Sequence, residues 1–260
     1  MAPVVSDIYN CSLCEGNVPD LMKMSLVTPV PKVTPPKKLE EDLRPITLTT
    51  PLAKILEGFT VEHLLKQVAD KLDIKQFSIS GKSTTHALVY LLHCILETLD
   101  KGNLYARVFF ADFSKGFDLV DHNALLNELH FLKVHNVIVK WLCSFLNNRT
   151  QVVRVGTALS APVTPRGGIP QGTKSAPLLF TILVNRLVNQ WPNRIKYVDD
   201  TTIFEVIPRC SPSYLQFIVE DISEFASSRG MRLNPKKCKE LEINFLKYQP
   251  VSLQPLRLGG

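Results

Sequence analysis

The sequence predicts a mixed fold of the α+β or α/β class, in which helices and strands are interleaved along the chain. Several segments carry apolar residues at helical spacing, and others are short runs of β-branched and aromatic residues bounded by turn formers. The 260 residues, 45% hydrophobic and 21% charged, can bury a sizeable core. A disulfide-stapled miniprotein and a disordered tail are therefore excluded.

The first half of the chain is expected to contain two long helices and a buried strand. Prolines between residues 27 and 44 exclude a long helix there. Apolar spacing predicts helices over residues 52–68 and 84–99. Residues 104–111 (LYARVFFA) are aromatic and β-branched and end at Asp112, which predicts a buried strand that runs into a turn.

The same patterns continue through the second half of the chain. We expect helices over residues 123–132, 137–147, 173–191 and 215–225, strands over residues 151–155, 161–163 and 241–245, and a turn over residues 165–172. The segment 173–191 is apolar nearly all round, as expected of a helix inside a larger core. Residues 195–198 and 201–204 predict a β-hairpin with Asp199 and Asp200 as its two-residue turn.

Charge and targeting signals give weaker information. The net charge of +6 is mild and is compatible with a polyanionic partner without identifying one. We find neither the roughly 18 uninterrupted apolar residues of a membrane span nor the pattern of a secretory signal. We therefore expect an intracellular protein, nuclear or cytoplasmic, that is not secreted and has no membrane partner. Its cysteines are expected to be thiols, because Cys11 and Cys14 lack the second ligand pair of a structural zinc site.

The placement of three acidic residues is the most informative feature. Asp112 ends an apolar strand, and Asp199 and Asp200 occupy the tip of an apolar hairpin. Adjacent carboxylates repel one another and become favourable when a divalent cation lies between them. Mg²⁺ prefers one or two carboxylates with water and phosphate oxygens, so phosphoryl transfer follows from such a site. On these residues alone, ordinary turn chemistry is the favoured interpretation, because Asx residues are the usual occupants of turns.

Three sequence blocks change this balance. Residues 111–118 (ADFSKGFD), 168–173 (GIPQGT) and 197–200 (YVDD) resemble, in order and approximate spacing, motifs A, B and C of reverse transcriptases. Flanking segments, such as 44–48 (RPITL) and 230–235 (GMRLNP), are similar to those of non-LTR (LINE-type) retrotransposon reverse transcriptases. The resemblance extends over most of the chain.

The resemblance implies a right-hand polymerase fold of the α+β class, with palm and fingers and an antiparallel palm sheet packed on helices. The implied divisions are fingers and an N-terminal extension in residues 1–104, palm in 105–121, a fingers/palm connecting segment in 122–165, and palm in 166–260. The sequence stops at Gly260, about where relatives continue into the primer grip and thumb, so we expect the thumb to be absent.

The implied function is RNA-directed DNA polymerisation, which adds dNTPs to a primer 3′-hydroxyl by two-metal phosphoryl transfer. The family's metal ligands correspond here to Asp112, Asp199 and Asp200, which would act as the catalytic residues and hold two Mg²⁺ ions, with Mn²⁺ as an alternative. The implied partners are an RNA template, a DNA primer and dNTP.

The resemblance also implies residues that bind substrate. Phe117 would pack under the sugar of the incoming nucleotide and select dNTPs. The PQG loop would lie against the nascent base pair, and basic finger residues would neutralise the triphosphate. The full set is Phe113, Phe117, Pro170, Gln171, Gly172, Lys32 and Arg44. A lysine after motif C would protonate pyrophosphate, and the sequence does not separate Lys236, Lys237 and Lys239.

Other interpretations stay open. A truncated or domesticated element fragment would bind nucleic acid without polymerising, and the expected absence of a thumb, which supplies backbone grip, motivates this alternative. A longer parent protein would supply thumb or endonuclease portions. A metal-dependent phosphohydrolase that uses the same acids is a further interpretation without positive support.

Overall fold

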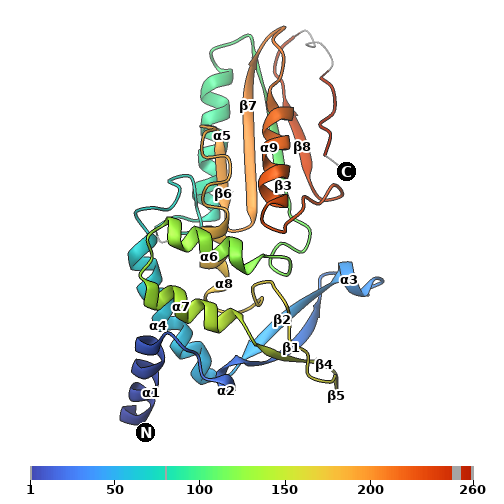
Figure 1. Ribbon diagram of the computed structural model, residues 1–260. Helices are drawn as coiled ribbons and strands as arrows, with labels where there is room; N and C mark the ends of the chain where they lie inside the picture. The colour runs from blue at the N-terminus through green and yellow to red at the C-terminus, as the bar shows by residue number, and fades with distance from the viewer. Residues whose placement is uncertain (1, 80, 248–252, 259–260) are drawn as a thin grey trace. The chain divides into compact units, whose positions relative to one another are not determined.

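In this computed structural model the chain divides into two compact units, and residues 2–79, 81–247 and 253–258 are described (Figure 1). Unit 1 comprises Met1–Lys71 and Phe117–Ile182, and unit 2 comprises Leu72–Gly116 and Leu183–Gly260. Each unit combines helices with a four-stranded sheet. The mixed-class prediction is confirmed, and the fold is α+β.

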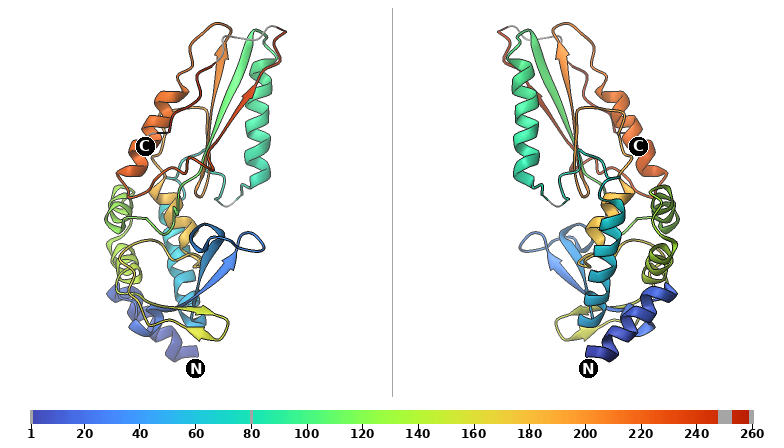
Figure 2. Two further views of the ribbon diagram at one scale, coloured as in Figure 1. Left: turned by 90° about the vertical axis from the view of Figure 1, so that its right-hand side faces the viewer. Right: turned by 90° about the vertical axis from the view of Figure 1, so that its left-hand side faces the viewer.

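The sheet of unit 2 has the order β6-β7-β3-β8 and is antiparallel throughout. Its strands are β3 (Leu104–Ala111), β6 (Arg194–Tyr197), β7 (Asp200–Pro208) and β8 (Lys239–Ile243). Helices α5 (Thr84–Leu99) and α9 (Leu215–Ser227) lie on its opposite faces (Figure 2). The central strand β3 has the predicted bounds, because its aromatic and β-branched residues are buried on both faces.

Alternation along β3 divides the core of unit 2 between the two helices. Ala106 and Val108 belong to one cluster with Leu91 and Ile95 of α5. The intervening residues of β3, among them Phe109, are also buried and point to the other face of the sheet. Each large apolar side chain buried in this way stabilises the fold by about 1.5–3 kcal/mol.

The sheet of unit 1 has the order β2-β1-β4-β5. Its strands are β1 (Met24–Pro31), β2 (Leu43–Thr49), β4 (Thr150–Val155) and β5 (Ala158–Leu159). The central strand β1 pairs antiparallel with β2 and parallel with β4. The remaining helices are α1 (Ala2–Glu15), α2 (Asp20–Lys23), α3 (Leu39–Asp42), α4 (Pro51–Val68), α6 (His122–Phe131), α7 (Asn136–Leu146) and α8 (Ala176–Leu183).

Several of the predicted helices begin where a side chain caps them. Thr50 accepts a hydrogen bond from Ala53 N at the start of α4, and Ser83 caps α5 in the same way. Asp121 Oδ1 accepts from Ala124 N at 2.7 Å and starts α6. Such caps satisfy backbone donors that the first helical turn leaves unpaired. The predictions for α4, α5, α6, α7 and α9 are confirmed within two residues. No helix in the described ranges is both long enough and apolar enough to cross a bilayer.

The proline-rich segment forms strands that the sequence did not predict. A long helix is indeed absent between residues 27 and 44, but β1 and β2 form an antiparallel pair there, connected through the short α3. Pro29 pairs with Pro45 across this ladder. Two of the missing N–H groups therefore fall at one rung, and the third, that of Pro31, falls at the end of β1 where it pairs with Leu43.

Two predicted elements were wrong. The second strand of the 150s hairpin is β5, and Val163 of the predicted segment 161–163 makes only an isolated bridge with Gln151. The helix predicted over residues 173–191 ends at Leu183, and turns follow. The carbonyls of the next two residues, Val184 and Asn185, accept hydrogen bonds from Lys196 Nζ at 3.2 and 2.8 Å. These two carbonyls thus accept side-chain hydrogen bonds at a point where the helix has already ended.

Candidate active site

The β6–β7 hairpin presents two of the predicted acids. Tyr197 at the end of β6 pairs with Asp200 at the start of β7, so the turn residues are Val198 and Asp199. The turn lies one residue earlier than predicted, because Val198 has a φ of +56° and Asp200 already pairs in the ladder. A positive φ at a β-branched residue is costly, so the surrounding structure must hold this turn in place.

Asp112 reaches the hairpin through the neighbouring strand. Ala111, the last residue of β3, pairs with Thr201 of β7. Asp112 follows Ala111 and Asp200 precedes Thr201, so both acids lie at the same end of the sheet. The charge of Asp112 acts on both Asp199 and Asp200. The structure of unit 2 therefore brings the three carboxylates together.

The electrostatics of this cluster disfavour three negative charges. Burial raises the pKa of Asp199, and the neighbouring charges of Asp200 and Asp112 raise it further. Loss of surrounding water raises the pKa of Asp200, and Asp112 adds to this effect. Lys237 Nζ, 3.7 Å from Asp112 Oδ1, acts in the opposite direction. The buried Oδ1 atom of Asp112 has no hydrogen-bond donor within the described part of the chain.

These observations fit a divalent cation. A cation between the carboxylates would relieve their mutual repulsion and would contact Asp112 Oδ1, which accepts no hydrogen bond within the described residues. Within the described ranges, no group of three or more His, Cys, Asp or Glu side chains is placed so that the group itself could hold a metal ion. Mg²⁺ does not require one, because it takes one or two carboxylates and completes its shell with water and phosphate oxygens.

The segment after the hairpin places one lysine beside the acids. Asn234 N donates to Asp112 O at 2.8 Å, and Asp112 N donates to Cys238 Sγ at 3.4 Å. These bonds hold Lys237 next to Asp112, whereas Lys239 already belongs to β8. The sequence reasoning did not distinguish among the three lysines, because all of them follow motif C at similar spacing.

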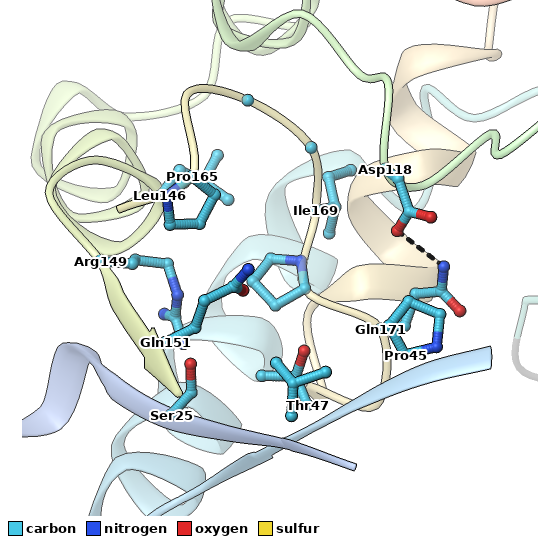
Figure 3. A pocket seen from close by; sticks show the side chains of 14 residues that line it. Ser25, Pro45, Thr47, Asp118, Leu146, Arg149, Gln151, Pro165, Ile169 and Gln171 are labelled. Atoms are coloured by element: carbon cyan, nitrogen blue, oxygen red, sulfur yellow. Dashed lines mark hydrogen bonds between the residues drawn. The ribbon is translucent and has the colours of Figure 1, made fainter. Parts of the chain in front are cut away.

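The PQG loop belongs to unit 1 and is held by hydrogen bonds on two sides. Gln171 O accepts from Thr47 N of β2 at 2.7 Å, and Gln171 Nε2 donates to Asp118 Oδ1 at 2.8 Å (Figure 3). Gly172 has a φ of +99°, and a Cβ there would lie 3.1 Å from Thr47 O. A glycine is therefore needed where the loop passes the strand.

The start of this loop is bound to the chain that follows motif A. Ile169 N donates to Phe117 O at 2.7 Å, and the ring of Phe117 lies 4.7 Å from the ring of Phe180 between centroids. His122 Nε2 lies 2.7 Å from Gly168 O. The sequence did not identify Asp118 and His122 as loop anchors, because their partners lie about 50 positions later in the chain.

A cavity of about 230 Å³ lies beside the PQG loop, between the loop and strands β1, β2 and β4 (Figure 3). Polar side chains that line it include Ser25, Thr47 and Gln151. Arg149 also lines it but is only 3% exposed, because its guanidinium packs over Phe145 and donates to Phe145 O. Burial lowers the pKa of Arg149 to about 10.

The remaining predicted residues lie in different surroundings. Phe113 is buried and bridges Leu233 in unit 2. Arg44 is exposed and pairs with Val30 in unit 1. Lys32, also exposed, donates from Nζ to Glu41 O at 2.9 Å. The predicted residues thus divide between the units. Asp112, Asp199, Asp200 and Phe113 belong to unit 2, and Phe117, Pro170, Gln171, Gly172, Lys32 and Arg44 belong to unit 1.

Comparisons with known sequences match this arrangement to one family. The family model of reverse transcriptase (RNA-dependent DNA polymerase) matches residues 31–249. The chain is 30% identical, over 97% of its length, to a probable RNA-directed DNA polymerase from transposon BS of Drosophila melanogaster, and it covers 29% of that protein. It is 26% identical, over 89% of its length, to the RNA-directed DNA polymerase from mobile element jockey of the same species, and it covers 26% of that protein. The chain therefore spans between a quarter and a third of the length of these relatives.

Solved structures share the fold at low sequence identity. Apo telomerase from Candida tropicalis, truncated from its C-terminal domain, aligns with a TM-score of 0.62 at 14% identity over 94% of this chain and 55% of that one. Telomerase from Candida albicans, in complex with a fragment of telomeric RNA, aligns with a TM-score of 0.60 at 12% identity over 94% of this chain and 46% of that one. From the family match over most of its length, the chain belongs to the reverse transcriptase family, as a domain homologous to the RNA-directed DNA polymerases of non-LTR retrotransposons.

Proposed function

We propose that this domain catalyses RNA-directed DNA polymerisation, adding dNTPs to the 3′-hydroxyl of a DNA primer on an RNA template. The observation that carries the proposal is the meeting of Asp112 with Asp199 and Asp200 at one end of the antiparallel sheet. Family membership supports the same chemistry. Three carboxylates with unfavourable mutual repulsion suit a reaction that needs divalent cations beside a triphosphate.

The three acids are proposed to hold two Mg²⁺ ions, with Mn²⁺ as a substitute. Bound there, the ions would activate the attacking hydroxyl and stabilise the leaving oxygen. Lys237 is the lysine that we propose as proton donor to pyrophosphate, since its Nζ lies 3.7 Å from Asp112 and its side chain is 56% exposed. It combines access to substrate with proximity to the acids.

Further substrate contacts are proposed from family membership. Phe117 would exclude a 2′-hydroxyl at the incoming sugar, and its contact with Phe180 supports a fixed ring position. Pro170, Gln171 and Gly172 would contact the nascent base pair. The exposed Lys32 and Arg44 would neutralise the triphosphate. Phe113, next to Asp112, stays in the proposed set as a residue that supports the site from the core.

The domain division stays a proposal as well. We propose fingers and an N-terminal extension in residues 1–104, palm in 105–121, a connecting segment in 122–165 and palm in 166–260. Strands β6, β7 and β8, and all of β3 except Leu104, fall within the two palm segments, which supports the division. We also propose that the domain works inside the cell, where RNA templates and dNTPs are available.

Primer extension tests the proposed function. The domain is incubated with Mg²⁺, dTTP and an oligo(dT) primer on poly(rA), and RNA binding is measured separately. Wild type should extend the primer, whereas Asp199→Asn should not, and both should bind RNA. Asp221→Asn, which removes an equal charge at an exposed position of α9, should extend like wild type. If wild type binds RNA but does not extend the primer above background, the domain is a nucleic-acid-binding fragment and the proposal is wrong.

A further inference from the structure

A short segment of unit 2 runs alongside β6 and supports the hairpin that carries Asp199. Lys196 N donates to Lys75 O at 2.9 Å, and Phe77 N donates to Lys196 O at 2.8 Å. Gln76 forms an isolated parallel bridge with Lys196. The backbone of this segment therefore pairs with β6 directly before the turn at Val198.

The side chain of Gln76 reaches the turn itself. Gln76 is 1% exposed, and its Oε1 accepts a hydrogen bond from Val198 N at 3.2 Å. The same oxygen accepts from Ser78 N at 3.2 Å and from Ser78 Oγ at 2.9 Å. Val198 is the residue with a φ of +56°, so this bond stabilises the strained conformation directly before Asp199.

A buried ion network fixes the segment against β6. Asp73 accepts two hydrogen bonds from Arg194, at 2.8 Å each, and lies 2.8 Å from Lys196 Nζ. Asp73 N also donates to Asn185 Oδ1 at 2.7 Å. The side chains of Asp73 and Lys196 are almost completely buried. Breaking the pairing of buried charges costs a large free energy, because an uncompensated charge is left in the interior. The network therefore holds one register between the segment and the strand.

We propose that Gln76 is a positioning residue for Asp199. It acts through Val198, because it touches the turn and not the carboxylate. Without the acceptor, Val198 N would be left unpaired in a half-buried turn, and the turn would relax toward a negative φ. The carboxylate of the next residue would then move away from Asp112. This inference rests on the proposed function, but part of its test does not depend on catalysis.

The test compares Gln76→Leu with two further variants. Leucine has a similar size and no acceptor, Gln76→Glu keeps an acceptor at nearly the same place, and Ser78→Ala removes a donor from the same oxygen while leaving the bond to Val198. Each purified domain is first shown to be folded by circular dichroism. Hydrogen exchange of the peptide that contains Val198 is measured next, followed by steady-state primer extension.

For Gln76→Leu we expect faster exchange at Val198 and a kcat about tenfold lower, with the KM for dTTP within about twofold of wild type. Ser78→Ala should match wild type in both measurements, and Gln76→Glu should recover most of the lost protection. A folded Gln76→Leu variant with unchanged exchange at Val198 overturns the proposal, and so does an unchanged kcat. If wild type does not extend primers, the proposed function fails, and the exchange measurement alone decides the role of Gln76.

Discussion

Ala111 of β3 pairs with Thr201 of β7, and this pairing brings Asp112 and Asp200 to the same end of the sheet, because Asp112 follows Ala111 and Asp200 precedes Thr201. Side chains alternate between the faces of a strand, so a slip of one residue between β3 and β7 would turn Asp200 to the other face of the sheet. The buried apolar residues of both strands hold the register. Residues that take no part in chemistry therefore determine where the acids meet.

The first prediction concerns stability without metal. A carboxyl group whose pKa rises on folding binds more protons in the folded state than in the unfolded state. Such a group therefore lowers the free energy of unfolding as the pH rises above 3.8, the ordinary pKa of an Asp carboxyl group. Asp199→Asn should therefore raise Tm in EDTA at pH 7, by about 2–4 °C for each kcal/mol gained. Thermal melts should show the difference in Tm between wild type and Asp199→Asn disappearing below pH 3.8, where Asp199 is neutral in both the folded and the unfolded protein. A lower Tm for Asp199→Asn at pH 7 would contradict this account of the acid cluster.

The second prediction concerns the start of the PQG loop. Gly168 has a φ of +83°, and a Cβ there would lie 2.6 Å from Asp118 O. Gly168→Ala should lower the free energy of unfolding by more than about 1 kcal/mol and reduce primer extension, because the loop must move. Gly156→Ala is the control, since Gly156 has a φ of +61° and open space around it. Urea denaturation should show a clearly larger loss for Gly168→Ala, and equal losses would show that the contact with Asp118 is unimportant.

The third prediction concerns sugar selection by Phe117. Phe117→Val shortens the side chain and removes its ring contact with Phe180. We expect incorporation of rNTP relative to dNTP to rise by about tenfold or more, because a hydroxyl excluded by sterics becomes tolerated. Competition between UTP and dTTP on poly(rA) measures this ratio. The exposed Phe131 provides the control Phe131→Val, which should leave the ratio unchanged. An unchanged ratio in Phe117→Val would remove Phe117 from the sugar site.

The fourth prediction concerns the buried ion network beside β6. Arg194 and Lys196 keep the pKa of Asp73 at about 2 although burial opposes its ionisation, and burial lowers the pKa of Lys196 to about 8. Asp73→Asn leaves Lys196 without its counter-ion and should cost about 3–5 kcal/mol at pH 7. Urea denaturation with the exposed-site variant Asp70→Asn as control measures the cost. A cost as small as that of the control would mean that the network does not hold this register.

The sequence was sufficient for elements with a strong local pattern. The strand β3 agrees with its prediction in both bounds, since LYARVFFA is apolar except for Arg107 and includes three aromatic residues and one β-branched residue. The capped helices agree with their predictions within two residues, because the residue that caps each helix directly precedes it in the sequence. The acids were identified from their positions at strand ends, and the family resemblance was confirmed by the match over residues 31–249.

Features that depend on distant partners could not be predicted. The end of α8 depends on Lys196, which takes the carbonyls of Val184 and Asn185. The strands β1 and β2 depend on Pro29 and Pro45 sharing one rung. In the candidate site, the contact of Lys237 with Asp112 and the bond of Gln76 to Val198 join residues more than 100 positions apart. No local pattern encodes such contacts.

The most direct measurement of the central claim is the rate of single-nucleotide addition by variants of the acid cluster. Asp112→Asn and Asp199→Asn should each lower this rate by about a thousandfold or more, and the double variant should be no slower, because ligands that act as one unit give non-additive losses. Asp221→Asn should retain the wild-type rate. Losses that multiply in the double variant, or an Asp112→Asn rate within tenfold of wild type, would contradict the claim that these carboxylates form one catalytic metal site.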